Sequence, residues 1–511
     1  MSKVKRILAV MMAMVMVLAM SIPTFAATTP TANDTAKGTV QNVEKAATVT
    51  AYQITKAQYD GGFIGYVKTD NKLAIADVLA PTPDEVTAIA KQIASGAVTL
   101  TSKTMTGAAV ADDVKYTDFT ADLNAGYWLV IVSGTVAEVY NPMLVGVYYS
   151  ANGSDNTMTS NPVNADSNWT LETSIAYAKS TTPSIKKEIV DGETAKGNDV
   201  AIGDTVNFKI TTTIPSYSKQ YDTVTVAISD TMSAGLTLDK NSIKINGAAI
   251  SADMIDTANV ETTDHGFTLP IKSEYAKANG GVELVVTYSA KVNDQATVNF
   301  DPNTNTAKLT YSNDPTNKDI TKETESKTYT YTFSIGAALS ATIQDYNRKV
   351  NQIIKVDAQG NVISTKTEDS GVTDGKVIEV KEGATFKLTN TVTGKVYTAT
   401  TGADGGLTFE GLDAGTYTLV ETKAPSGFTL NDKEIPVVIS ATYTTEGQLE
   451  TLTITIDGEH TSTYTASYTE EGTVNTITET TQVTDVVNTK LANLPSTGGM
   501  GTYLFTIIGV V

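Results

Sequence analysis

Apolar and polar residues alternate strictly in the stretch Val224-Thr225-Val226-Ala227-Ile228-Ser229-Asp230. Side chains two residues apart lie on the same face of a β-strand, so this spacing predicts a strand that buries one face. Similar short runs recur along the chain, and turn signals such as Asp191-Gly192 and Asn246-Gly247 separate them. The pattern predicts an all-β fold in which β-sandwiches follow one another along the chain.

The composition supports strands and argues against several classes of function. The 511 residues include 85 threonines and 23 tyrosines, two residue types that favour half-buried strands. A net charge of −19 argues against nucleic acid as a partner. The chain has no cysteine and only two histidines, which argues against disulfides, thiol catalysis and a multi-histidine metal site.

Changes of pattern divide the chain into segments. The first domain contains one predicted helix, Pro83–Ile93, with acidic residues in its first turn. Residues 123–130 resemble residues 412–420 with one residue inserted, so the first and third domains are predicted to share a related fold. The expected segments are a signal peptide over 1–26, an N-terminal domain over 27–179, a middle domain over 180–336, a C-terminal domain over 337–490 and a terminal signal over 491–511.

The first 26 residues are organised as a secretory signal peptide. Three basic residues, Lys3, Lys5 and Arg6, precede an apolar run over 7–20, and Ala26 ends a small-residue cleavage site. The run is too short for a membrane-spanning helix, and polar sequence follows it. The chain is therefore predicted to be exported.

Period-two spacing places one polar residue among apolar residues in each of three middle-domain strands. Lys187 lies between two isoleucines on one face, Asp230 follows three apolar residues, and Asn305 begins an apolar face. A lone buried polar group is destabilising, but an amine, an acid and an amide that meet can neutralise one another or react. Lys186 is the rival of Lys187 for this role, although it has the opposite parity.

The third domain is predicted to bury a carboxylate by the same rule. Glu421 shares a strand face with Tyr417 and Leu419, so it must be protonated or paired. The run Tyr417–Phe428 closely resembles the E-box of Gram-positive pilins and Cna-B-like domains. The resemblance implies immunoglobulin-like (Cna-type) β-sandwiches in an elongated tandem of three.

In that family the E-box glutamate assists an intramolecular Lys–Asn isopeptide bond. Carried over to this chain, the resemblance implies that Glu421 assists a bond between Lys355 and Asn488.

The middle domain is similar to that of backbone pilins, with an aspartate in place of the glutamate. The resemblance implies that Asp230 assists a bond between Lys187 and Asn305. Burial would give a neutral, nucleophilic amine and a protonated acid that stabilises the oxyanion as ammonia leaves. Because this self-modification occurs once per molecule, we expect no enzymatic turnover, and we expect no cofactor or metal.

The last residues include Leu494-Pro495-Ser496-Thr497-Gly498, followed by an apolar stretch over 503–511. This segment resembles the Leu-Pro-x-Thr-Gly sorting signal of Gram-positive surface proteins, which a sortase cleaves. The apolar stretch is too short to span a bilayer, so we expect that the sequence is truncated there.

One strand is predicted over Trp169–Lys179, where alternate residues are mostly large and apolar and a lysine ends the run. The segment resembles the pilin motif, although Tyr177-Ala178-Lys179 stands where the family has Tyr-Pro-Lys and the spacing from the tryptophan is one residue longer. The resemblance implies that Lys179 of one subunit attacks the acyl intermediate that a pilin-specific class C sortase forms at Thr497 of the next.

Taken together, these resemblances imply the backbone (major) subunit of a covalently polymerised pilus, or fimbria, anchored to a Gram-positive cell wall. The expected partners are identical subunits, the class C sortase, and a housekeeping sortase with peptidoglycan; minor pilins and host surface ligands are further candidates. The alternative is a monomeric wall-anchored adhesin or a minor pilin. Lys179 discriminates between them, because only a shaft subunit needs an acceptor lysine.

Overall fold

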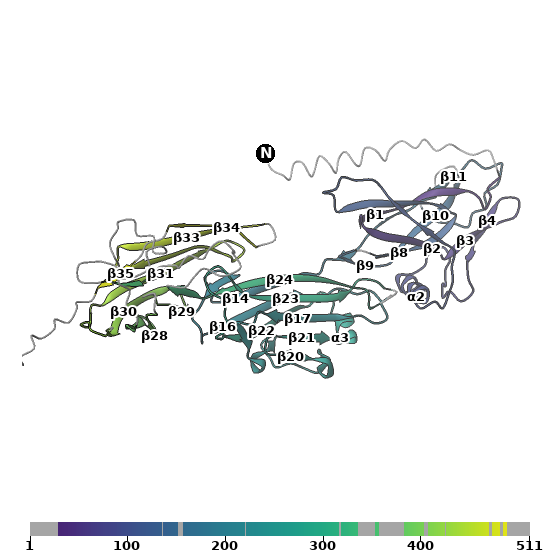
Figure 1. Ribbon diagram of the computed structural model, residues 1–511. Helices are drawn as coiled ribbons and strands as arrows, with labels where there is room; N and C mark the ends of the chain where they lie inside the picture. Colours follow the sequence, from purple (N-terminus) through teal and green to yellow (C-terminus); the bar gives the residue numbers. More distant parts are fainter. Residues whose placement is uncertain are drawn as a thin grey trace, which may run out of the picture.

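The computed structural model consists of β-sheets packed in successive units along an elongated molecule (Figure 1). It confirms the predicted all-β fold class, because strands form most of the regular structure. Within the described ranges, no helix is long and apolar enough to cross a membrane. The structure describes residues 29–134, 136–151, 157–219, 221–315, 318–335, 353–356, 383–402, 407–424, 426–469, 473–480 and 484–487.

Two sheets enclose the core of the N-terminal part, which Val40, Phe119, Trp128 and Val145 help to fill. One sheet has the order β12 (Ile175–Tyr177), β1 (Thr35–Glu44), β7 (Tyr116–Asn124) and β6 (Thr106–Gly107). The other has the order β11 (Trp169–Thr173), β10 (Met143–Ala151), β8 (Gly126–Gly134), β2 (Ala47–Gln53) and β5 (Ser102–Thr104). Two short pairs join β3 (Thr55–Tyr59) to β4 (Phe63–Lys68) and β9 (Val139–Tyr140) to β13 (Ser180–Thr181).

The predicted helix is confirmed as α2 (Pro83–Ala94), which covers one face of β8. A capping box fixes its start, because the hydroxyl of Thr82 accepts a hydrogen bond from the backbone N–H of Glu85. Leu129 and Ile131 pack under this helix, while their neighbours on β8 enter the core between the sheets. β8 is therefore buried on both faces.

The middle part is a second pair of sheets around one core. Alternate residues of its strands are buried as predicted, although the strand quoted first begins at Val226 and not at Val224. One sheet contains β14 (Ile185–Val190), β16 (Thr205–Thr213), β22 (Glu283–Val292), β18 (Leu236–Leu238) and β19 (Lys244–Ile245). The other has the order β15 (Gly197–Asp199), β24 (Thr321–Tyr331), β23 (Asn303–Ser312), β17 (Val226–Met232), β21 (Gly266–Ile271) and β20 (Glu261–Thr263). Short helices are η1 (Lys240–Ser242), η2 (Thr257–Asn259) and α3 (Ser273–Ala278).

A seven-stranded sheet provides most of the third core. Tyr331, Phe333 and Ile335 also pack into this core. The sheet has the order β28 (Val396–Thr400), β27 (Thr385–Asn390), β30 (Gly415–Lys423), β31 (Ile435–Tyr443), β32 (Leu449–Ile456), β33 (His460–Tyr468) and β34 (Val474–Thr480). Two further pairs join β25 (Phe333–Ile335) to β29 (Phe409–Leu412) and β26 (Ile353–Val356) to β35 (Thr484–Val487).

The two similar sequence segments take the same local form in the first and third parts. In each, a strand begins at a glycine with positive φ and an aromatic side chain donates a hydrogen bond back along the chain. Trp128 Nε1 donates to the carbonyl of Asn124 at 2.8 Å, and the Tyr417 hydroxyl donates to the carbonyl of Asp413 at 2.9 Å.

Candidate functional site

Lys187 is the buried polar residue at the centre of the middle part. It lies on β14 between Ile185 and Ile189, which enter the same core, and its side chain is fully shielded from solvent. Its rival Lys186 lies on the opposite face and forms an ion pair with Glu188 at 2.5 Å. The predicted parity of the two lysines is confirmed.

Asp230 and Asn305 reach the cluster from the opposite sheet. They lie on the antiparallel neighbours β17 and β23, where Asp230 is paired with Ala307 and Asn305 with Met232. This register makes the two polar side chains diagonal neighbours on one face. Lys187 Nζ donates a hydrogen bond to Asp230 Oδ2. The structure thus brings the predicted amine, acid and amide to one buried place.

Tyr288 completes this cluster, and reasoning from sequence missed it. Its hydroxyl accepts a hydrogen bond from Lys187 Nζ, donates one to Asp230 Oδ2 at 2.7 Å and accepts one from Asn305 Nδ2 at 3.2 Å. The rings of Tyr288 and Phe208 also lie 4.8 and 5.0 Å from the lysine nitrogen. Tyr288 occupies an apolar face of β22, so the sequence alone gave no reason to separate it from core residues.

Burial is the largest influence on each ionisable group in the cluster. It lowers the pKa of Lys187 to about 8, although the Asp230 carboxylate opposes this change. It raises the pKa of Asp230 against the opposing charge of Lys187, and it raises the pKa of Tyr288 well above its ordinary value. The amine therefore loses a proton more easily, and the acid gains one more easily, than either would in water.

Two oxygens of the cluster are buried acceptors without a hydrogen-bond partner among the described residues, Asp230 Oδ1 and Asn305 Oδ1. An unsatisfied buried acceptor is costly. Protonation of Asp230 would add a donor to this site, because a neutral carboxylic acid carries one O–H. The arrangement therefore suits a neutral acid beside a neutral amine.

In the third part, Glu421 is buried as predicted. Only 2% of it is exposed, and Oε2 accepts a hydrogen bond from the backbone N–H of Asn431 at 2.8 Å. Lys355 lies on β26, which runs parallel to β35 with Lys355 paired to Val486. Its predicted partner, Asn488, lies outside the described residues. The sorting-signal residues and the signal peptide lie outside them as well.

The prediction of one strand over Trp169–Lys179 is wrong, because the segment crosses from one sheet to the other. β11 pairs with β10 in the five-stranded sheet, whereas β12 runs parallel to β1 in the four-stranded sheet. The break falls at Ser174. Beyond it, Ile175 and Tyr177 are exposed and Ala176 is buried, the reverse of the predicted parity.

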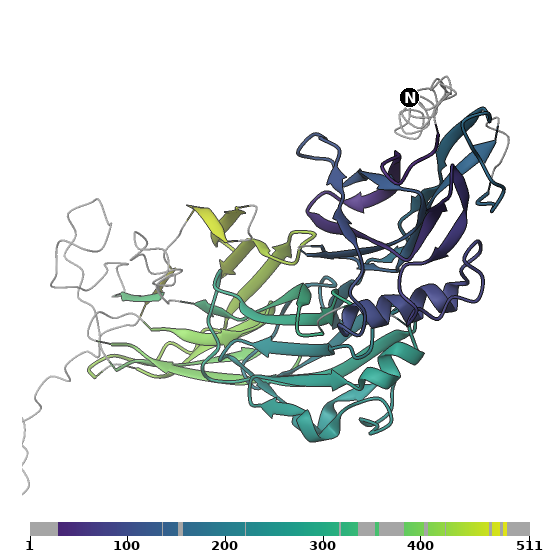
Figure 2. The same ribbon diagram turned by 90° about the vertical axis from the view of Figure 1, so that its right-hand side faces the viewer.

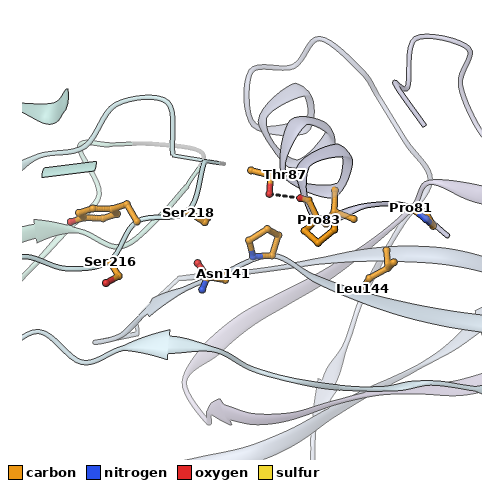
Figure 3. Close-up of a pocket in the computed structure, with 10 residues that line it drawn as sticks. Pro81, Pro83, Thr87, Asn141, Leu144, Ser216 and Ser218 are labelled. Carbon is orange, nitrogen blue, oxygen red and sulfur yellow. Dashed lines mark hydrogen bonds between the residues drawn. The ribbon is translucent and has the colours of Figure 1, made fainter. Parts of the chain in front are cut away.

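Lys179 is exposed directly after β12, where the chain leaves the first part. Its carbonyl accepts a hydrogen bond from the backbone N–H of Asn141 at 3.0 Å, and the next two residues pair with β9. The backbone is therefore held while the side chain stays at the surface. Asn141 also lines a cleft between α2 and the middle part, together with Pro81, Pro83, Val86, Thr87, Pro142, Leu144, Ser216, Tyr217 and Ser218 (Figure 3).

The neighbouring helix contacts the middle part through ion pairs. α2 lies at the boundary between the two parts (Figure 2). Lys91 pairs with Asp222 at 2.6 Å, and Asp84 pairs with Lys219 at 2.7 Å. All four side chains are at least half exposed, so these pairs contribute little to stability.

Glu138 holds the connection between the first and middle parts, and reasoning from sequence missed it too. This buried carboxylate accepts hydrogen bonds from the hydroxyls of Ser180, Thr182 and Tyr116 and forms an ion pair with Lys115 at 2.9 Å. Burial raises the pKa of Glu138, but the hydrogen bonds from Ser180, Tyr116 and Lys115 outweigh it and lower the pKa to about 2. The carboxylate is therefore ionised in the folded chain.

Replacing Glu138 by Gln should remove the pH dependence that this group gives to the first part. Because its pKa is lower in the folded chain, ionised Glu138 stabilises the fold above its ordinary pKa of 4.5, and that contribution is lost as the pH falls toward 2. Between neutral pH and pH 2, the free energy of unfolding should fall by roughly 3 kcal/mol through this group.

The chain's two tryptophans, Trp128 and Trp169, lie in this part, so urea unfolding followed by their fluorescence measures that loss. Asp122→Asn, at an exposed position, is the matched control and should keep the original pH profile. An unchanged profile in Glu138→Gln would contradict the assigned role.

Within the described ranges, no group of three or more histidine, aspartate or glutamate residues is placed to hold a metal ion.

Comparisons with known proteins match this arrangement of parts. A T6 antigen Ig-like domain matches residues 33–180, the Cna-B-like domain of Gram-positive pilin backbone subunit 2 matches 202–315, and a SpaA prealbumin-like fold domain matches 352–453. The trypsin-resistant surface T6 protein of Streptococcus pyogenes serotype M6 is 26% identical over 529 residues, which cover 93% of this chain and 92% of that relative. The chain is similar to Gram-positive backbone pilins.

A solved backbone pilin shares this fold. The T6 backbone pilin of serotype M6 Streptococcus pyogenes aligns with a TM-score of 0.63 at 22% identity, covering 91% of this chain and all of that one (100%). The full-length major pilin SpaD from Corynebacterium diphtheriae aligns with a TM-score of 0.47 at 17% identity, covering 92% of this chain and 100% of that one.

Five of the predicted site residues fall within the matched domains, and Lys187 lies between the first two matches. Lys179 lies one residue before the end of the T6 antigen Ig-like match. Asp230 and Asn305 fall within the backbone-subunit match, and Lys355 and Glu421 fall within the SpaA match. The predicted resemblance to backbone pilins is thereby confirmed.

Proposed function

We propose that this chain is the structural backbone subunit of a covalently polymerised pilus on a Gram-positive cell surface. Similarity to a surface T6 protein along 93% of the chain supports this role, as does the fold shared with a T6 backbone pilin. The observation that carries the proposal is the fully buried Lys187 in contact with Asp230, beside an amide. In a chain without cysteine, a Lys–Asn bond there would replace the disulfide as a covalent brace.

In the middle domain, the bond forms between Lys187 Nζ and the side-chain carbon of Asn305. Transfer of a proton from the amine to Asp230 leaves a neutral nucleophile and a neutral acid. Attack on the amide carbon places negative charge on Asn305 Oδ1, which the protonated acid stabilises by donating a hydrogen bond. The bond to Nδ2 then breaks, ammonia leaves, and a new amide remains.

The third domain carries an equivalent bond between Lys355 and Asn488, assisted by Glu421. The burial of Glu421 supports this assignment, because a carboxylate inside a core requires a partner or a proton. The parallel pairing of β26 with β35 also supports it, because Lys355 stands opposite Val486, two residues before Asn488.

The domains are proposed to follow one another along the chain. The first, over 27–179, ends at the acceptor lysine. The middle and third domains follow over 180–336 and 337–490.

Polymerisation joins Thr497 of one subunit to Lys179 of the next through a class C sortase, after export directed by residues 1–26. The exposure of Lys179 supports an acceptor role, since an enzyme must reach this amine. Donor and acceptor lie in different parts of the chain, and such head-to-tail contacts produce filaments when the rotation between subunits does not close a ring. A housekeeping sortase then attaches the polymer to peptidoglycan.

Expression of the chain with its sorting signal and a class C sortase tests this function. A backbone subunit should give a ladder of covalent multimers that survives boiling in detergent. If only monomer forms, a monomeric wall-anchored adhesin or minor pilin becomes the better account.

A further inference from the structure

The hydroxyl of Tyr288 contacts every group that reacts in the middle-domain cluster. It is hydrogen bonded to the attacking nitrogen of Lys187, to the carboxylate of Asp230 and to the leaving nitrogen of Asn305. The geometry points to Tyr288 as a further catalytic residue, the proton relay of Lys187–Asn305 bond formation. This inference rests on the proposed isopeptide chemistry and names the group that moves its protons.

The first transfer activates the amine. Lys187 Nζ donates to the Tyr288 oxygen, and the Tyr288 hydroxyl donates to Asp230 Oδ2. A proton that moves from the ammonium to the phenol oxygen, while the phenol proton moves to the carboxylate, leaves a neutral amine and a neutral acid. The tyrosine is unchanged at the end of this step.

The second transfer releases ammonia. After attack, the former lysine nitrogen carries a positive charge and the former amide nitrogen has become a basic amine. Because Asn305 Nδ2 lies 3.2 Å from the Tyr288 oxygen, the phenol can give its proton to that nitrogen and take one from the attacking nitrogen. The carbon–Nδ2 bond breaks, ammonia departs, the carbonyl re-forms, and Tyr288 is again neutral.

The surroundings of Tyr288 suit a relay and not a permanent base. Tyr288 is only 3% exposed, so bulk solvent does not reach its hydroxyl and cannot take over the proton transfer. Burial and the nearby Asp230 both raise the pKa of Tyr288, so the phenol keeps its proton between transfers. The ring packs against Phe208 at 5.4 Å and Phe267 at 4.9 Å, which fixes the direction of the hydroxyl.

Tyr288→Phe tests the relay, because it removes the hydroxyl and keeps the ring. General acid–base groups contribute about 100-fold or more to a rate, so bond formation should slow by about that factor. The readout is the fraction of purified full chain that has lost the middle-domain ammonia, followed by mass spectrometry of the linked Lys187–Asn305 peptide over time. Tyr311→Phe, which removes another hydroxyl of the same core, should react at the original rate.

The outcomes separate the relay from the proposed function. An unaltered chain that lacks the bond overturns the isopeptide proposal and the relay with it. If the unaltered chain has the bond and the Tyr288→Phe chain forms it equally fast, the relay alone is overturned. If Tyr288→Phe fails to fold, 3-fluorotyrosine placed at position 288 keeps the shape and acidifies the phenol. A relay predicts a shifted pH profile of the bond-forming rate, whereas an unshifted profile contradicts it.

Discussion

Replacing Lys179 by Ala should abolish the covalent ladder that the unaltered chain forms with a class C sortase. The lysine side chain is exposed, whereas the backbone around it is held by Asn141 and β9. Removing the amine therefore removes the nucleophile and leaves the surrounding structure in place. The measurement is a detergent gel of cell-wall extracts, in which multimers should disappear and monomer should remain.

Lys186→Ala is the matched control for that experiment. Lys186 is also exposed and lies in the same region of the chain, but it is paired with Glu188 on β14 and not placed at the junction. The Lys186→Ala chain should form the same amount of multimer as the unaltered chain. A ladder that persists without Lys179 would show that another lysine is the acceptor.

Replacing Asp230 by Asn should leave the middle domain without its internal bond. The amide side chain keeps the shape of the acid but cannot take the proton of Lys187. Loss of a cross-link that closes a loop of about a hundred residues costs on the order of 4–5 kcal/mol in the chain-entropy estimate. The variant should therefore unfold its middle domain at a lower denaturant concentration. It should also retain the ammonia that the unaltered chain loses from this domain, once its mass is corrected for the substitution itself.

Asp239→Asn is the control for this change, because Asp239 lies in the same domain and caps the exposed helix η1. It should keep the ammonia loss and lose little stability. An Asp230→Asn chain that still shows the middle-domain bond would mean that another group assists the reaction.

The alternation of residues along each strand predicts three members of the buried cluster. Lys187, Asp230 and Asn305 each stand in a strictly alternating strand, so burial of their neighbours fixes the direction of their side chains. Glu421 followed from the same rule. Period-two spacing shows only which face of a strand a residue occupies. It does not show which residues of the opposite sheet that side chain meets, because this depends on how the two sheets pack.

Other features depend on contacts that no local pattern records. A buried tyrosine at position 288 has the pattern of a core residue, and only the facing strands reveal polar partners for its hydroxyl. The role of Glu138 depends on the hydroxyls of Ser180 and Thr182, which are far from it in sequence. The strand break at Ser174 was missed because alternation continues through it, although the chain changes sheets there.

An accurate mass of the folded, exported chain tests the central claim most directly. The account predicts a mass below that of the sequence by two ammonias, with linked peptides joining Lys187 to Asn305 and Lys355 to Asn488. A mass equal to that of the unmodified chain would contradict it.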